Sequence, residues 1–118
     1  MAIVDYQLST PFRGASIVKW PSLANEDTGR PYSHASFNDR SVDVLGTFGS
    51  GGTVLIEGSN EVIATSFATL NDQQGNPVSV TLRKIVAIME NVVHIRPRVS
   101  AVDANTLIDV YLLLVGGE

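Results

Sequence analysis

The chain has 118 residues, of which 44% are hydrophobic and 17% are charged, with a net charge of −4 and no cysteine. This length fits one domain with a single packed core, and the missing cysteines exclude disulfides and thiolate metal sites. The acidic balance, with no run of lysine or arginine, argues against nucleic acid as a partner. The charged fraction is below the roughly 25% of an ordinary soluble domain, so we expect part of the surface to be buried against protein neighbours.

The start of the chain, MAIVDYQLST, lacks the basic residues and the apolar run of a secretory signal. The longest apolar run, Val110 to Val115, is too short to span a bilayer. We therefore expect a protein that is made and kept in a cytosol, or released by lysis rather than secretion, with no membrane partner.

Residues 1–14 alternate briefly and then stop at Pro11 and Gly14, which predicts an N-terminal arm or edge strand. Residues 15–118 are predicted to form one β-sandwich domain. A short strand is expected from Ala15 to Trp20, followed by an irregular connection over 21–38 that is rich in turn formers. Such long connections tend to be functional or interfacial.

Residues 39–60, DRSVDVLGTFGSGGTVLIEGSN, predict two strands joined by a glycine-rich turn. Val42 and Val44 share one face of the first strand, and Val54 and Ile56 share one face of the second, with Thr53, Leu55 and Glu57 on its opposite face. This period of two predicts an antiparallel hairpin with one apolar face, which a second sheet must cover. A further strand is predicted from Val62 to Leu70, then a turn over 71–77 and a short strand from Val78 to Val80.

The period changes over residues 81–90, where Leu82, Ile85, Val86 and Met89 are spaced as on one face of a helix. This spacing predicts one short helix, about 82–90. A strand is the alternative, because Val86 and Ile88 are β-branched. Taken together, the elements predict an all-β, jelly-roll-like antiparallel β-sandwich with one short helix.

Two strands complete the prediction. Over 92–99, His94, Arg96 and Arg98 point outward, and Pro97 predicts an edge strand or a bulge because it cannot donate to a ladder. The segment 106–115 is apolar on both faces, so its outer face should be covered by a partner subunit or by the N-terminal arm.

The residues show no pattern typical of catalysis. Neither histidine has metal-ligand spacing, the serines lack a nucleophile-elbow context, and the glycine-rich turn is not followed by a helix. We therefore predict no catalytic, metal or cofactor-binding residues, no cofactor and no enzyme activity. The predicted site is a protein interface on the segment from Lys19 to Arg40, on the cationic stripe that contains Arg96 and Arg98, and on the two termini. Its residues are Trp20, Arg30, Tyr32, Phe37, Arg40, His94, Arg96, Arg98, Leu107, Tyr111 and Leu113.

Three segments carry a family resemblance: KWPSLANEDTGRP, DRSVDVLGTFGSGGTVLIEGSN, and FATLNDQQGNPVSVT through HIRPRV. They run from Lys19 to Val99, and together they resemble head decoration (cement) proteins of tailed bacteriophages, which are β-sandwich virion proteins. The resemblance implies a structural protein on the capsid exterior, with the major capsid protein and a homodimer or homotrimer of itself as partners. It implies no catalytic residues.

The alternative is a phage tail or fibre domain, or a carbohydrate-binding β-sandwich module. The piece IEGSN, followed by a strand ending ATLND, resembles discoidin-like and carbohydrate-binding sandwiches. There the turn usually continues Asn-Asp-Gly before an aromatic residue, whereas this chain has Glu61-Val62 in place of Asp-Gly. Tyr32 and Phe37, in the long connection, are the aromatic residues that a sugar site would use.

Overall fold

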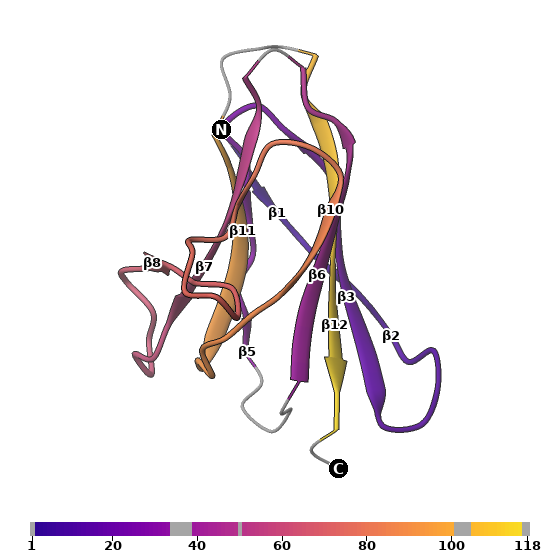
Figure 1. The fold of residues 1–118 in the computed structure, drawn as a ribbon, viewed down its shortest axis with the longest axis vertical. Helices are drawn as coiled ribbons and strands as arrows, with labels where there is room; N and C mark the ends of the chain where they lie inside the picture. Colours follow the sequence, from indigo (N-terminus) through magenta and orange to yellow (C-terminus); the bar gives the residue numbers. More distant parts are fainter. Residues whose placement is uncertain (1, 34–38, 50, 101–104, 117–118) are drawn as a thin grey trace.

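The computed structural model describes residues 2–33, 39–49, 51–100 and 105–116, and these residues form an all-β protein with two sheets (Figure 1). The strand pairs are antiparallel except for β1 (Ile3–Val4) and β4 (Thr28–Gly29), which run parallel. The predicted antiparallel β-sandwich is therefore confirmed. No helix in this part of the chain is long and apolar enough to cross a membrane.

The five-stranded sheet has the order β10 (Lys84–Ala87), β6 (Asp39–Thr47), β12 (Leu107–Val115), β3 (Ala15–Ala24) and β2 (Gln7–Ser9). Its central strand is β12, which has the alternation that the sequence predicted. The inward residues Ile108, Val110, Leu112 and Leu114 are at most 1% exposed. The residues that alternate with these four lie on the outer face of the five-stranded sheet.

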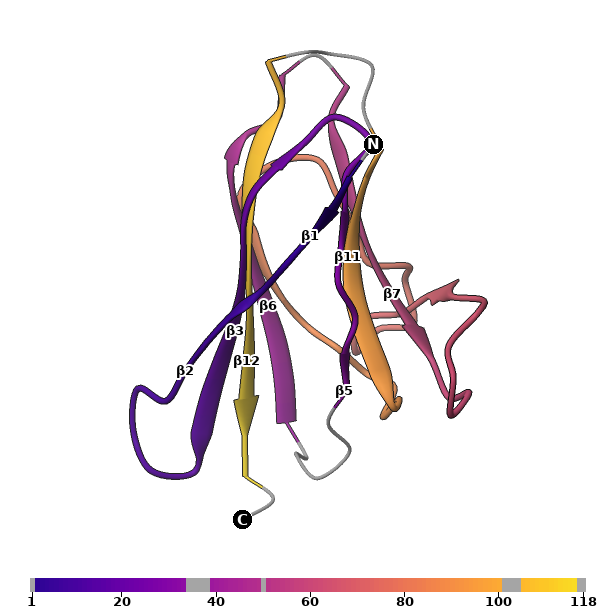
Figure 2. The same ribbon diagram turned by 180° about the vertical axis from the view of Figure 1, so that it is seen from behind.

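The seven-stranded sheet has the order β1, β4, β11 (His94–Ser100), β7 (Thr53–Ser59) and β8 (Ala68–Thr69). In addition, β5 (Tyr32–Ser33) pairs with β11, and β9 (Ser79–Val80) pairs with β7. The two sheets face each other across one core, seen from both sides in Figures 1 and 2. The largest side chains of this core are Trp20, Leu23, Ile56, Ile108, Leu112 and Leu114.

The predicted hairpin over 39–60 is right in its strands and faces but wrong in its pairing. β6 pairs with β10 and β12, whereas β7 pairs with β11, β8 and β9. The chain therefore crosses from one sheet to the other between these strands. Val42 and Val44 meet Val54 and Ile56 across the core, where all four are at most 1% exposed. A pair of alternating strands fits either arrangement, because the apolar face is the same in both.

The predicted helix at 82–90 is wrong, because Lys84–Ala87 is strand β10 and pairs antiparallel with β6. Val86 and Ile88 are buried, whereas Leu82 and Ile85 are 63% and 64% exposed. Burial thus follows a period of two, and the β-branched residues decide the local structure. The predicted strand from Val62 to Leu70 is also wrong over 62–67, because only Ala68–Thr69 of that segment is a strand.

Pro97 does not mark an edge or a bulge, contrary to the sequence prediction. β11 lies between β4 and β7, and its register with β7 runs without a shift from His94 to Ser100. The neighbour on the other side is Gly29 in β4. A Cβ at Gly29 would lie 2.6 Å from Pro97 Cδ and 2.6 Å from Trp20 Cδ1. A glycine therefore makes room for the proline ring inside the sheet.

The N-terminal segment is built into both sheets. β1 is the end strand of the seven-stranded sheet, and β2 is the end strand of the five-stranded sheet. The segment extends each sheet at its edge, where β1 pairs with β4 and β2 pairs with β3. Within the described residues, the N-terminal segment therefore does not cover the outer face of β12, which was one of the two predicted covers. Residues 21–33 are also more regular than predicted, because β3 continues to Ala24 and is followed by β4 and β5.

Candidate functional site

The cationic stripe on β11 is partly neutralised by Glu57 on the neighbouring strand β7. Arg96 Nε donates to Glu57 Oε1 at 3.0 Å, and Arg98 Nε donates to Glu57 Oε2 at 2.9 Å. The Glu57 side chain is only 8% exposed, so its charge is held by these two arginines. The stripe is therefore a structural cluster with one net positive charge rather than a free cationic surface.

Arg96 also contacts the aromatic ring of Phe67, with its guanidinium carbon 3.8 Å from the ring centroid. This is a cation–π contact with the last residue of the loop between β7 and β8. The alternation over 53–57 places Glu57 on the face of its strand opposite Val54 and Ile56, but the sequence alone cannot show which strand lies beside it. The partners of the stripe were missed for that reason.

His94, on β11, forms a hydrogen bond with the start of the loop after β7. Its Nε2 lies 2.7 Å from the carbonyl oxygen of Glu61, and its Nδ1 lies 2.5 Å from Ser33 Oγ. A carbonyl can only accept, so Nε2 carries the proton, and in the neutral ring Nδ1 accepts from the serine. A nucleophile–base pair needs a third group that orients the base, usually a carboxylate. Here the group that orients His94 is the backbone carbonyl of Glu61. The hydrogen bonds of His94 therefore join three segments of the fold: β5, β11 and the loop after β7.

The segment 60–67, called the Glu61 loop below, is organised by the carboxylate of Glu61. Glu61 Oε1 accepts from the backbone N–H groups of Thr65 and Ser66, each at 2.9 Å. The hydroxyls of Thr65, Ser66 and Ser59 lie 3.2 to 3.3 Å from the same carboxylate. The backbone hydrogen bonds from Thr65 and Ser66 are the main cause that lowers the pKa of Glu61 from 4.5 to about 2.

The tip of the Glu61 loop presents two aliphatic side chains to solvent. Val62 is 92% exposed and Ile63 is 81% exposed. The base of the loop is held by His94 and by Asn60, whose Oδ1 accepts from the backbone N–H of Val93 at 2.9 Å. The loop is thus an apolar projection with a fixed backbone. This loop was not predicted, because Val62 and Ile63 fit the alternating pattern of a strand.

The outer face of the five-stranded sheet carries a second apolar surface, called the apolar sheet face below. An open depression of about 390 Å³ lies on it. It is lined by Ile17, Leu45, Ile85, Tyr111 and Leu113, together with Ser41 and Asp43. Three predicted interface residues belong to this side of β12, namely Leu107, Tyr111 and Leu113. Leu107 is 52% exposed, and Tyr111 and Leu113 are half-buried.

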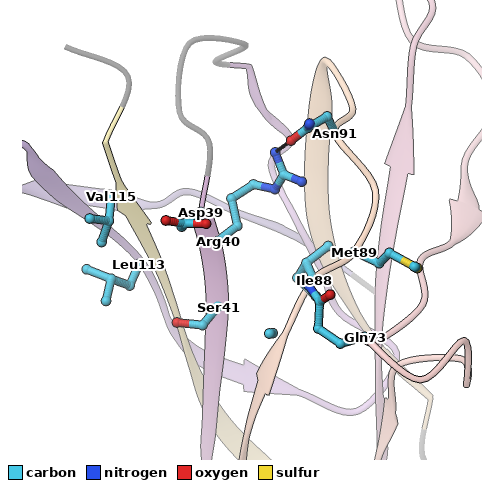
Figure 3. Close-up of a pocket in the computed structure, with 10 residues that line it drawn as sticks. Asp39, Arg40, Ser41, Gln73, Ile88, Met89, Asn91, Leu113 and Val115 are labelled. Carbon is cyan, nitrogen blue, oxygen red and sulfur yellow. Dashed lines mark hydrogen bonds between the residues drawn. The ribbon is translucent and has the colours of Figure 1, made fainter.

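Arg40 is a structural residue rather than a surface contact. It is 7% exposed, and its guanidinium donates to Asn91 Oδ1 and to the carbonyl of Glu90 (Figure 3). Burial lowers the pKa of Arg40. The hollow beside it, about 260 Å³, lies between the start of β6, the end of β12 and the segment after β10. Arg40 therefore ties that segment to β6.

Two of the predicted interface residues between Lys19 and Arg40, Trp20 and Tyr32, are internal. Trp20 is 1% exposed and donates through Nε1 to the carbonyl of Arg30 at 2.9 Å. Tyr32 is 9% exposed and packs edge-to-face on Tyr6 at 5.3 Å between ring centroids, and burial is the main cause that raises the pKa of Tyr32. Arg30 is exposed and pairs with Asp5. Phe37 lies outside the described residues. Trp20 and Tyr32 are thus core residues, which corrects their expected place at the surface.

Within the described ranges, no group of three or more His, Cys, Asp or Glu side chains could hold a metal ion. What the geometry offers chemically is contact area: a fixed apolar loop on one sheet and an apolar face on the other. The two surfaces lie on opposite sides of the molecule, as the positions of β8 and β12 show (Figures 1 and 2).

No family model and no curated protein matches this chain. The SPBc2 prophage-derived protein YomS has a similar structure, with a TM-score of 0.64 over 92% of this chain and 100% of that chain. The sequence identity is 9%, so the likeness shows the fold. Protein NMB1881 from Neisseria meningitidis matches more weakly, with a TM-score of 0.44 and 11% identity over 94% of this chain and 82% of that chain. That lower score supports no inference.

Proposed function

We propose that this protein is a non-enzymatic structural component of a bacteriophage virion. In this proposal it binds the outer surface of the capsid and stabilises the capsid by bridging shell subunits. The fold that it shares with a prophage-derived protein supports a phage origin. Its partners are the major capsid protein and further copies of itself, and its place is the capsid exterior.

The observation that carries the proposal is the presence of two exposed apolar surfaces on opposite sides of one small sandwich. A bridging protein needs at least two separate contacts, and apolar side chains in fixed positions supply contact energy with little loss of entropy. The Glu61 loop fits the contact with the shell. Val62 and Ile63 do not pack into the core cluster of this fold, and the backbone that presents them is already held.

The physical logic of decoration is mass action. A protein that binds the assembled shell and not its free subunits stabilises the assembled state. Repeated copies multiply that effect over the capsid surface, because each bound copy opposes separation of the subunits that it joins.

The test is the number of copies of this chain in purified phage particles, measured by quantitative mass spectrometry against the major capsid protein. A copy number in fixed, near-stoichiometric ratio to the shell protein supports decoration. A handful of copies per particle contradicts decoration and assigns the chain to the tail or fibre. Absence from the particles overturns the virion proposal, and binding to host glycans would then be the next measurement.

A further inference from the structure

The apolar sheet face has a regular arrangement across its five strands. One row of outward residues is Ile85, Asp43, Tyr111, Lys19 and Gln7, taken from β10 to β2. The next row, in the same order, is Ala87, Ser41, Leu113, Ile17 and Ser9. The first row therefore places charges of opposite sign on the two strands that flank β12.

The charges sit symmetrically about the central strand. Asp43 on β6 and Lys19 on β3 are both direct neighbours of Tyr111 on β12. Lys19 Nζ lies 5.2 Å from the centroid of the Tyr111 ring, and Asp43 accepts from Arg83 at 3.0 Å. A second copy of the same face, placed over the first with β12 on β12, can be oriented in two simple ways.

The charges distinguish these two orientations. With the two-fold axis across the strands, Lys19 meets Lys19 of the second copy and Asp43 meets Asp43. With the axis along β12, the β3 side of one copy faces the β6 side of the other copy. Lys19 of each copy then faces Asp43 of the other, so this pair of opposite charges occurs twice. Like charges placed opposite each other disfavour a contact, and opposite charges fix its register.

We propose that two copies of this chain associate face to face through the apolar sheet face, with the two-fold axis along β12. Tyr111 and Leu113 meet their own counterparts at the axis, and Ile17 packs opposite Ser41 of the second copy. Two Lys19–Asp43 pairs flank this seam. Asp109 lies one outward position further along β12, where its Oδ1 accepts from the backbone N–H of Ser22 at 2.8 Å, and it limits the apolar seam at that end.

The size of the face is adequate for such a dimer. The three central strands have nine or ten residues each, whereas β10 has four and β2 has three. At about 3.3 Å along a strand and about 4.8 Å between strands, the footprint is roughly 550 Å². Two copies together would bury about 1,100 Å², just above the ~1,000 Å² that a specific interface needs. The proposal does not depend on the virion proposal, because it concerns the purified chain alone.

The test is the mass of the purified full chain in solution, measured by sedimentation equilibrium over a range of concentrations. We expect a dimer, and we expect K19E and D43K each to weaken it by about tenfold or more. The K19E/D43K double variant should restore the affinity, because the exchanged charges again face each other across the axis. Arg83→Ala is the control, since it removes only the ion pair within one chain. Thermal unfolding of each variant checks that the fold is intact.

Each outcome decides the proposal. A chain that stays monomeric up to about 100 μM overturns the proposal, because its free energy of association would then be weaker than about −5.5 kcal/mol. A dimer that is unaffected by both single charge reversals, or that is not restored by the double variant, overturns the assigned face or axis. As a further probe of the seam, Leu113→Lys should abolish association while leaving the monomer folded, because Leu113 is half-buried on the outer side.

Discussion

Glu61 fixes the conformation of a loop through one carboxylate that is itself exposed to water. The loop has few apolar contacts of its own, so the hydrogen bonds to Thr65 and Ser66 determine its shape. Such bonds favour the ionised form and lower the pKa of Glu61 to about 2, below its ordinary value of 4.5. Because the pKa is lowered in the folded protein, the stabilisation is complete above about pH 4.5 and is lost as the pH falls toward 2.

The first prediction concerns this carboxylate. In a carboxyl carbon NMR titration, Glu61 should titrate with a midpoint near 2, and Glu61→Ala should speed amide hydrogen exchange at Thr65 and Ser66 at neutral pH. The control Glu26→Gln, at an exposed turn residue outside the loop, should leave both amides unchanged. A Glu61 midpoint at its ordinary value, or unchanged exchange in Glu61→Ala, would show that the loop is not held in this way.

Glu57 is the opposite case, a carboxylate buried between two arginines. Glu57→Gln leaves Arg96 and Arg98 beside each other without an anion, and we expect a loss of about 2 kcal/mol in the free energy of unfolding. Asp5→Asn is the matched control, because it breaks the exposed pair with Arg30 and should cost less than about 1 kcal/mol. Urea denaturation of the three proteins measures both. Equal losses in the two variants would mean that burial of the Glu57 ion pairs adds nothing to the free energy of unfolding.

At the scale of the elements, the sequence pattern predicted the strands well and their partners poorly. The alternation in β6, β7, β11 and β12 identified the inward residues correctly, because burial imposes a period of two on any half-buried strand. It could not show that β6 and β7 lie in different sheets, since both arrangements bury the same faces. Short segments were the least predictable. The helical spacing at Leu82, Ile85 and Met89 occurs in residues that the fold leaves exposed.

The candidate site was predictable only where it lies on a long strand. The outward, apolar residues of β12 predicted the apolar sheet face. Trp20 and Arg40 were expected at the surface but are buried, because their partners come from segments distant in sequence. The Glu61 loop could not be predicted, since its shape depends on five hydrogen-bonding groups that converge on one side chain.

The contact of Gly29 with Pro97 gives a prediction for the packing of β4 on β11. Gly29→Ala places a methyl group against the proline ring and against Trp20, which should cost about 2 kcal/mol in the free energy of unfolding. In a Pro97→Ala background the cost should fall, because part of the crowding is gone. Urea denaturation of the four proteins of this cycle provides the measurement. Additive effects would contradict the assigned contact.

At the scale of the whole molecule, the two apolar surfaces lie on different sheets and share no residues, so each is free to make a contact of its own. If the Glu61 loop binds the shell and the apolar sheet face joins two copies, a dimer carries two shell contacts at once. The second contact then forms at a high effective concentration, so a dimer is retained on the particle more strongly than a monomer.

The last prediction separates these tasks. V62S/I63S should keep the thermal stability and the dimer of the parent chain, because neither side chain packs in the fold, yet it should no longer bind purified particles that lack the protein. Leu113→Lys should bind those particles through one contact only, with an apparent affinity about 100-fold or more below that of the dimer. Cosedimentation with the particles measures both. If V62S/I63S binds as well as the parent chain, the shell contact is not the Glu61 loop; if Leu113→Lys is monomeric and binds equally well, the dimer contributes nothing to attachment.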